Sequence, residues 1–234
     1  MPRRYFVTGT DTEIGKTTIA AGLLHAARAR GLTTAAVKPV AAGCDRTADG
    51  LRNDDALTLM AECNPPLAYD LLNPVALEPA IAPHIAAAEA GVELTAAQLA
   101  RACAKVFEGD ADLTLVEGAG GWRVPLNETQ TLADLAIALG EPVIMVVGLR
   151  LGCINHALLT AEAIAADGLT LAGWVANQVD PHMDRQQHNL DTLKALMPAP
   201  LLGVVPRITP LTMDRVAEHL QLDALLDTTS GLSS

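Results

Sequence analysis

At 234 residues, half of them apolar, the chain is long enough to bury a substantial core, and we expect one α/β domain over 1–226 with a tail at 227–234. The net charge of −11 argues against nucleic acid or an anionic membrane as a partner, and 3% aromatic residues provide little surface for stacking bases. Four cysteines without a C-x-x-C pair and the lack of a signal-peptide core or membrane span predict a cytoplasmic protein with reduced thiols.

Apolar runs of strand length alternate with segments of helical period along the chain. The predicted strands are 5–8, 34–39, 113–117, 142–148, 171–179 and 200–206, and the predicted helices are 16–30, 54–63, 95–109, 154–168 and 184–197. Continuous apolar strands that alternate with helices indicate a mostly parallel sheet with helices on both faces. Residues 64–92 are rich in Pro and Ala and fit this alternation poorly, so we expect them to form an insertion over an edge of the sheet.

The stretch GTDTEIGKTT follows the first strand and opens the first helix, which is the context of a phosphate-binding loop. Backbone amides of the loop bind phosphates, Lys16 adds a positive charge, and the Thr17 hydroxyl is placed to bind magnesium. Five residues separate Gly9 from Gly15 where the common motif has four, so the loop is a variant. We therefore expect a P-loop NTPase-type fold with ATP and magnesium as ligands.

Further charged residues lie where predicted strands end. Glu117 closes an apolar strand, and Lys38 ends the second strand. Such side chains provide magnesium ligands and neutralise a transferring phosphoryl group, although Lys38 could instead reach solvent from the strand end. Asp54 and Asp55 either cap the following helix or bind the metal, and the two roles could coexist.

The chain resembles the dethiobiotin synthetase family over most of its length. The similar stretches are YFVTGTDTEIGKT, KPVAAG, GLRNDDAL, NP, PH, LVEGAGGWRVPL, PVIMVVGLRLGCINHALLT and LAGWVANQV. The resemblance implies that 7,8-diaminononanoate and carbon dioxide form a carbamate, that ATP phosphorylates it, and that the second amine closes a cyclic urea with release of ADP and phosphate. Two anions must meet in this reaction, which lysines and magnesium can support.

The resemblance also implies roles for individual residues. Magnesium would lie on Thr17, Asp55 and Glu117, and Lys38 would be catalytic, with Lys16 and Thr12 at the reacting groups. The nucleotide would contact Glu13, Ile14, Gly15, Lys16, Thr17, Thr18, Asp55, Glu117, Gly118, Ala119, Gly120, Asn177, Gln178, Pro206, Arg207 and Ile208. The substrate would contact Ala42 and, from the neighbouring subunit of a homodimer, Leu151, Gly152, Cys153, Ile154 and Asn155.

Three segments of these blocks leave questions about particular residues. The family commonly has serine where this chain has Ala42, so a substrate hydrogen bond is expected to be missing or replaced by water. In the loop, we expect Glu13 to orient a lysine or to support a magnesium ligand, and Asp11 to shape the turn. The amides of Cys153, Ile154 and Asn155 are expected to be free for an anion.

Alternative functions predict features that the sequence lacks. A switch ATPase of the partition or iron-protein kind carries a second lysine at the position of Asp11. An amidating ligase of the same superfamily would need a glutaminase domain, for which the chain is too short.

The stretch NQVD at 177–180 is similar to a guanine-binding signature, so other triphosphates stay possible, although we expect ATP.

Overall fold

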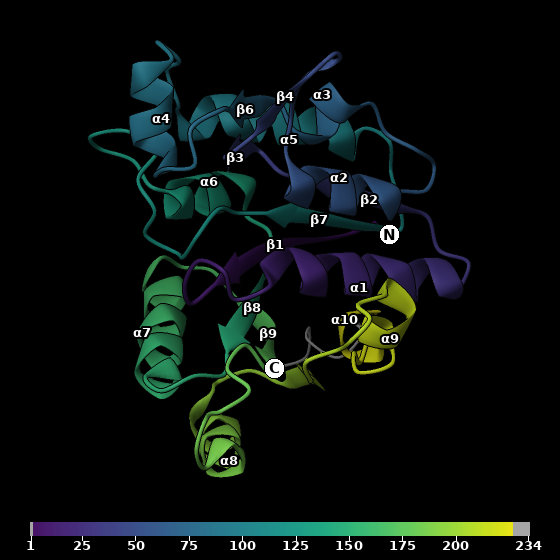
Figure 1. Cartoon of the computed structure of the whole chain (residues 1–234), viewed down its shortest axis with the longest axis vertical. Coiled ribbons are helices and arrows are strands. Elements are labelled where there is room, and N and C mark those ends of the chain that lie inside the picture. Colours follow the sequence, from purple (N-terminus) through teal and green to yellow (C-terminus); the bar gives the residue numbers. More distant parts are fainter. Residues whose placement is uncertain (1, 227–234) are drawn as a thin grey trace, which may run out of the picture.

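The computed structural model describes residues 2–226 and is built around a six-stranded sheet (Figure 1). All neighbouring strands pair in parallel, in the order β10-β9-β8-β1-β7-β2. The strands are β1 (Arg3–Gly9), β2 (Thr34–Val37), β7 (Leu113–Glu117), β8 (Val143–Gly148), β9 (Leu171–Asn177) and β10 (Leu201–Val205). After β1 the chain adds β2 and β7 on one side of β1 and then β8, β9 and β10 on the other. The carboxyl end of β1 is therefore the switch point at which such sheets bind ligands.

Alternate side chains of each strand enter two separate cores, as the parallel α/β prediction requires. In β1, Tyr5 and Val7 pack into the core under the first group of helices, while Phe6 enters the core on the opposite face. The first group contains α1 (Lys16–Ala29), α2 (Asp54–Ala61), α9 (Met213–Ala217) and α10 (Asp223–Leu226). The second contains α5 (Ala96–Phe107), α6 (Leu132–Leu139), α7 (Cys153–Ala166) and α8 (Gln186–Leu196).

The predicted insertion begins beside the edge of the sheet, because Asn64 forms an antiparallel bridge to Thr34 of β2. It then folds into α3 (Tyr69–Leu72), β6 (Val75–Leu77) and α4 (Pro83–Glu89). Strand β6 pairs in parallel with β3 (Val40–Ala42), and β4 (Asp45–Thr47) forms a hairpin with β5 (Gly50–Arg52). These small sheets lie in the upper part of Figure 1, together with α3 and α4, and the sequence analysis predicted neither of them.

Several predicted boundaries were wrong. The strand at 34–39 ends at Val37, because the chain leaves the main sheet at Lys38 and enters β3 after Pro39. Helix α6 was missed, since it is short and follows an irregular loop. Cys44, Cys63, Cys103 and Cys153 are buried and free, as expected. The proposed tail at 227–234 lies outside the described residues, and within 2–226 no helix is long and apolar enough to cross a bilayer.

Candidate active site

The loop between β1 and α1 has a backbone that only particular residues allow. Gly15 has a φ of +83°, and a Cβ atom added there would lie 2.3 Å from the side-chain nitrogen of Asn177. That nitrogen donates to the carbonyl oxygen of Ile14 at 2.8 Å, so the end of β9 supports the loop from below. Ile14 is buried beneath the loop. The N–H groups of Lys16 and Thr17 donate to no acceptor within residues 2–226 and are available to an anion.

Lys16 is buried at the start of α1, and its ammonium group donates to the carbonyl oxygen of Asp11 at 2.9 Å. Burial and the nearby Lys38 ammonium lower the pKa of Lys16 to about 8, although Glu117 and other carboxylates oppose the shift. The lowered pKa reflects the free-energy cost of burying the charged Lys16 ammonium group with too few negatively charged or hydrogen-bonding partners. Phosphate oxygens would supply the missing partners.

Lys38 and Glu117 form a buried ion pair at the ends of the neighbouring strands β2 and β7. The Lys38 Nζ atom lies 2.5 Å from Glu117 Oε1 and 2.9 Å from Asp55 Oδ2. Burial alone would lower the pKa of Lys38, but the two carboxylates outweigh this effect and raise it above its usual value. Burial raises and Lys38 lowers the pKa of Asp55, and the net result is a lowered pKa. The cluster therefore holds both signs of charge at neutral pH.

The same cluster offers hard oxygen ligands to a divalent cation. The Thr17 hydroxyl donates to Glu117 Oε1 at 2.8 Å, and the Asp55 side chain is half exposed beside them. Glu117 Oε2 is buried and has no hydrogen-bond partner among the described residues. A fully buried carboxylate oxygen without a partner is costly, and a cation would relieve that cost. Two carboxylates and a hydroxyl fit magnesium, which prefers oxygen and keeps several waters.

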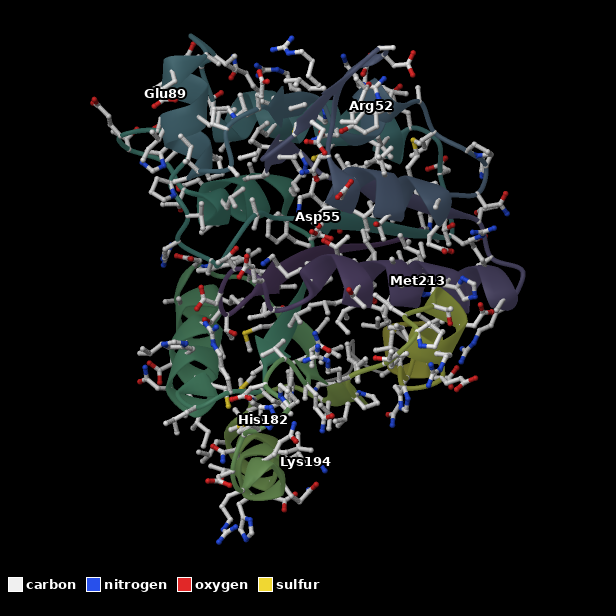
Figure 2. The ribbon with its side chains drawn as sticks, in the orientation of Figure 1. Arg52, Asp55, Glu89, His182, Lys194 and Met213 are labelled. Carbon is white, nitrogen blue, oxygen red and sulfur yellow. The ribbon has the colours of Figure 1, made fainter. Side chains whose placement is uncertain are left out.

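A cavity of about 820 Å³ opens beside these groups. Figure 2 shows Asp55 between the ribbons of α2 and α1, which border this region. Of the predicted residues, the cavity is lined by Thr12, Glu13, Gly15, Lys16, Thr17, Thr18, Lys38, Ala42, Asp55, Ala119 and Gly120. The structure thus brings together the predicted loop, lysines and carboxylate of α2, with Glu117 buried just behind the cavity wall.

Other predicted residues lie away from the cavity wall. Asn177 supports the loop, and Gln178 donates to the side chain of Gln186 at 3.0 Å. Pro206, Arg207 and Ile208 follow the end of β10. Gly118 lies directly after β7, and its N–H donates to the carbonyl oxygen of Val7 at 3.0 Å. None of these six residues lines the cavity.

The loop before α7 differs in one respect from the expectation. The N–H of Cys153 donates to the carbonyl oxygen of Arg150 at 3.0 Å, so this amide is not free. The N–H groups of Ile154 and Asn155 have no acceptor in the part of the chain that the structure describes. Leu151 is 91% exposed. Leu151 to Asn155 do not line the cavity of their own chain.

The two acidic residues of the phosphate loop, Asp11 and Glu13, have different contacts. Asp11 forms an ion pair with Arg150 and accepts a hydrogen bond from the Thr12 N–H at 2.8 Å, so it does shape the turn. Glu13 has a φ of 55° and lines the cavity, but it contacts neither lysine through a hydrogen bond or ion pair in the described chain. Its predicted role in orienting a lysine therefore has no support in this structure.

The capping alternative for the two aspartates is also resolved. Asn53 caps α2 by accepting a hydrogen bond from the Ala56 N–H at 3.2 Å, while Asp54 and Asp55 occupy the first turn. Asn53 also lines the cavity, and the sequence analysis did not predict this. Ala41, Val124 and residues 80–83 complete the wall and were likewise missed. Their apolar side chains carry no chemical signal in the sequence.

The glycine loop after β7 connects the cavity wall to a buried aromatic residue. Ala119 and Gly120 line the cavity, and Trp122 follows two residues later. The Trp122 ring meets Phe6 edge to face, with centroids 6.1 Å apart, and its Nε1 donates to Asp167 at 2.7 Å. This packing fixes the far end of the glycine loop against the core.

Comparisons with known proteins identify similar sequences. Residues 3–215 match the family model described as AAA domain. The chain is 65% identical over 221 residues to the ATP-dependent dethiobiotin synthetase BioD of Pseudomonas paraeruginosa, covering 94% of this chain and 97% of that protein. It is 57% identical over 225 residues to the protein of the same name from Cellvibrio japonicus, covering 96% and 98%.

A solved structure shows the same fold at low sequence identity. The MinC:MinD cell division protein complex of Aquifex aeolicus contains a chain with a TM-score of 0.58 and 14% identity, covering 96% of this chain and 93% of that chain. The likeness supports the parallel P-loop architecture alone.

Proposed function

Because this chain belongs to the ATP-dependent dethiobiotin synthetases, we propose that the cavity beside the phosphate loop is where its ring-closing ligation takes place. The activity is that of a ligase of biotin biosynthesis. The observation that carries the assignment of the site is the convergence of Lys16, Lys38, Asp55 and Thr17 on one wall of the cavity, with Glu117 behind it.

The lysines act on the two anions that must meet. The carbamate of 7,8-diaminononanoate carries a carboxylate-like charge, and one of its oxygens attacks the γ-phosphorus of ATP while the bond to ADP breaks. Lys38 neutralises the carbamate and the transferring phosphoryl group, and Lys16 binds the phosphates together with the loop amides. The second amine then attacks the carbonyl carbon of the mixed anhydride, phosphate leaves, and the cyclic urea closes.

Asp55, Glu117 and Thr17 would hold magnesium, which neutralises phosphate charge when it is bound. The buried, unpartnered Glu117 Oε2 supports this assignment. The carboxylates also hold the Lys38 ammonium in a fixed place before any substrate binds. A preorganised charge needs little rearrangement during the reaction. Thr12 lies on the same wall and would contact the reacting groups.

The diamine would lie along the part of the cavity that Ala42 lines. Its carboxylate would be bound by the partner subunit of a homodimer through the loop Leu151 to Asn155. The highly exposed Leu151 supports this role, because an apolar side chain favours burial. The amides of Ile154 and Asn155 also support it, because they have no acceptor among the described residues and such amides favour an anion. Asn177 ends β9, whereas Gln178 and 206–208 follow the adjacent strands β9 and β10. These residues would surround the adenine base of ATP, with Gly118 behind the phosphates.

The test is to incubate the protein with diaminononanoate, bicarbonate, magnesium and ATP, and to detect dethiobiotin by mass. We expect one phosphate to be released for each cyclic urea, and Lys38→Met to abolish both. Equal phosphate release with and without the diamine would instead support the switch ATPase. Sedimentation of the protein would test the homodimer, with Leu151→Glu expected to give monomers.

A further inference from the structure

Lys38, the proposed catalytic lysine, and Asp55 belong to different elements, so the distance between their side chains depends on how these elements are held together. Lys38 follows β2, whereas Asp55 lies in the first turn of α2. Between them runs a set of buried hydrogen bonds from the segment that contains α3, and the mechanism above gives these bonds no role.

The bonds form a continuous path from one backbone to the other. The Asn53 N–H donates to the Tyr69 hydroxyl at 2.8 Å, and this hydroxyl donates to Asn73 Oδ1 at 3.0 Å. The Asn73 side-chain nitrogen donates to the carbonyl oxygen of Lys38 at 2.7 Å. Together with the Lys38–Asp55 ion pair, the path closes into a ring around the start of α2.

The direction of each bond follows from the groups available. The carbonyl oxygens of Lys38 and Val75 can only accept, so the nitrogen of the Asn73 amide faces them and its oxygen faces Tyr69. The Tyr69 hydroxyl must therefore donate its proton to Asn73 and accept from the Asn53 N–H. Burial raises the pKa of Tyr69, so the hydroxyl keeps its proton at neutral pH.

Packing alone does not explain a tyrosine at this position. The ring is buried, and the guanidinium of Arg52 lies 4.2 Å from its centroid on the outer side, where Figure 2 shows Arg52 near α3. A phenylalanine would make the same contacts. The hydroxyl adds only the two hydrogen bonds, and both lead to site residues: Asn53 caps the helix that carries Asp55, and Asn73 binds the backbone of Lys38.

We infer that Tyr69 is a positioning residue for the ligation, because its hydroxyl and Asn73 set the distance between the Lys38 ammonium and the Asp55 carboxylate. The inference rests on the roles proposed above for Lys38 and Asp55. It gives the segment at 64–92 a function: Tyr69 and Asn73 of this segment hold the backbones of Asn53 and Lys38, and residues 80–83 form part of the cavity wall.

Tyr69→Phe tests the inference, because it removes the hydroxyl and keeps the ring. We expect kcat to fall about ten-fold or more and the magnesium concentration for half-maximal rate to rise several-fold, since small displacements of reacting groups are costly. The KM for ATP should change less than about two-fold, because none of the three hydrogen bonds of this path involves a residue of the phosphate loop.

The only other tyrosine is a matched control. Tyr5 is buried on β1, and its hydroxyl donates to the carbonyl oxygen of Leu225 at 2.6 Å, away from the cavity. Tyr5→Phe should lower the unfolding temperature without changing kcat. An unchanged kcat in Tyr69→Phe, or an equal loss in both variants, would overturn the inference.

Asn73→Ala provides the same test if Tyr69→Phe does not fold, with the same expected and contradicting results. All rates are measured at a temperature at which circular dichroism shows the variant folded. The unaltered protein distinguishes the two levels of the argument: if it makes no dethiobiotin, or if Lys38→Met keeps its rate, the proposed function fails. If those controls behave as expected and Tyr69→Phe is fully active, only the positioning role fails.

Discussion

Replacing Lys38 by methionine should destabilise the protein strongly, apart from its effect on the reaction. The lysine side chain is 4% exposed and its partner Glu117 is 0% exposed, so the change leaves a buried carboxylate without its countercharge. Breaking a buried ion pair from one side costs about 3–5 kcal/mol. For a chain of this size each kcal/mol lowers the melting temperature by about 2–4 °C, which gives a loss of roughly 6–20 °C.

A second variant separates the charge effect from loss of packing. In Lys38→Met/Glu117→Gln the buried side chain is neutral, and its oxygen can still accept the hydrogen bond from Thr17. We expect the double variant to recover more than half of the lost stability. Asp55→Asn should cost about 1 kcal/mol or less, because the Asp55 side chain is 49% exposed and solvent screens its charge.

The assay is urea unfolding followed by circular dichroism, in buffer with EDTA so that no divalent cation replaces the lost ammonium. Stability is compared as a double-mutant cycle over the parent, both single variants and the double variant. A loss below about 1 kcal/mol in Lys38→Met, or a double variant no more stable than that single variant, would refute the electrostatic reasoning.

Three other outcomes follow from particular sites. Burial raises the pKa of Cys63 to about 11 and that of Cys103 to about 12. At pH 9, iodoacetamide should therefore label both thiols at least about 100-fold more slowly in the native protein than in the urea-unfolded protein, as measured by peptide mapping. Comparable labelling rates would contradict the burial of these cysteines. Asp11→Asn should lower the unfolding free energy by less than about 1 kcal/mol in urea titrations, because its ion pair is partly exposed, and a larger loss would show that the pair matters more than its exposure suggests. Gly15→Ala should weaken binding of a fluorescent ATP analogue at least about ten-fold, because the added Cβ atom would collide with Asn177. Gly31 has a similar φ of +80° but nothing within 4 Å of an added Cβ atom, so Gly31→Ala should bind the analogue normally. Equal binding by both variants would contradict the predicted collision.

The main sheet and the phosphate loop could be predicted because their signals are local. Each strand is a short apolar run, and the loop residues are contiguous in the sequence. The contact between Lys38 and Glu117 could also be predicted, because both residues lie at the carboxyl ends of parallel strands and these ends share one edge of the sheet. Fold and charged groups thus follow from pattern and topology.

The rest of the site depends on contacts between distant segments. The run through Lys38 reads as one strand, but Pro39 lacks an N–H and the chain turns into a separate small sheet. Tyr69 meets the Asn53 backbone across 16 positions, and no periodicity in the Pro- and Ala-rich segment indicates that contact. The Cys153 amide was expected to be free because its acceptor, the Arg150 carbonyl oxygen, belongs to a turn that the sequence pattern does not indicate.

The chain contains two tryptophans, and their surroundings differ in a useful way. Trp174 is fully buried in β9, with its Nε1 bonded to the Ala199 carbonyl oxygen at 3.2 Å, remote from the cavity lining. Trp122 closes the glycine loop, in which Ala119 and Gly120 form part of the cavity wall. Intrinsic fluorescence can therefore report ligand entry without any added dye: emission from the loop indole should respond, and the indole in the sheet serves as an internal reference.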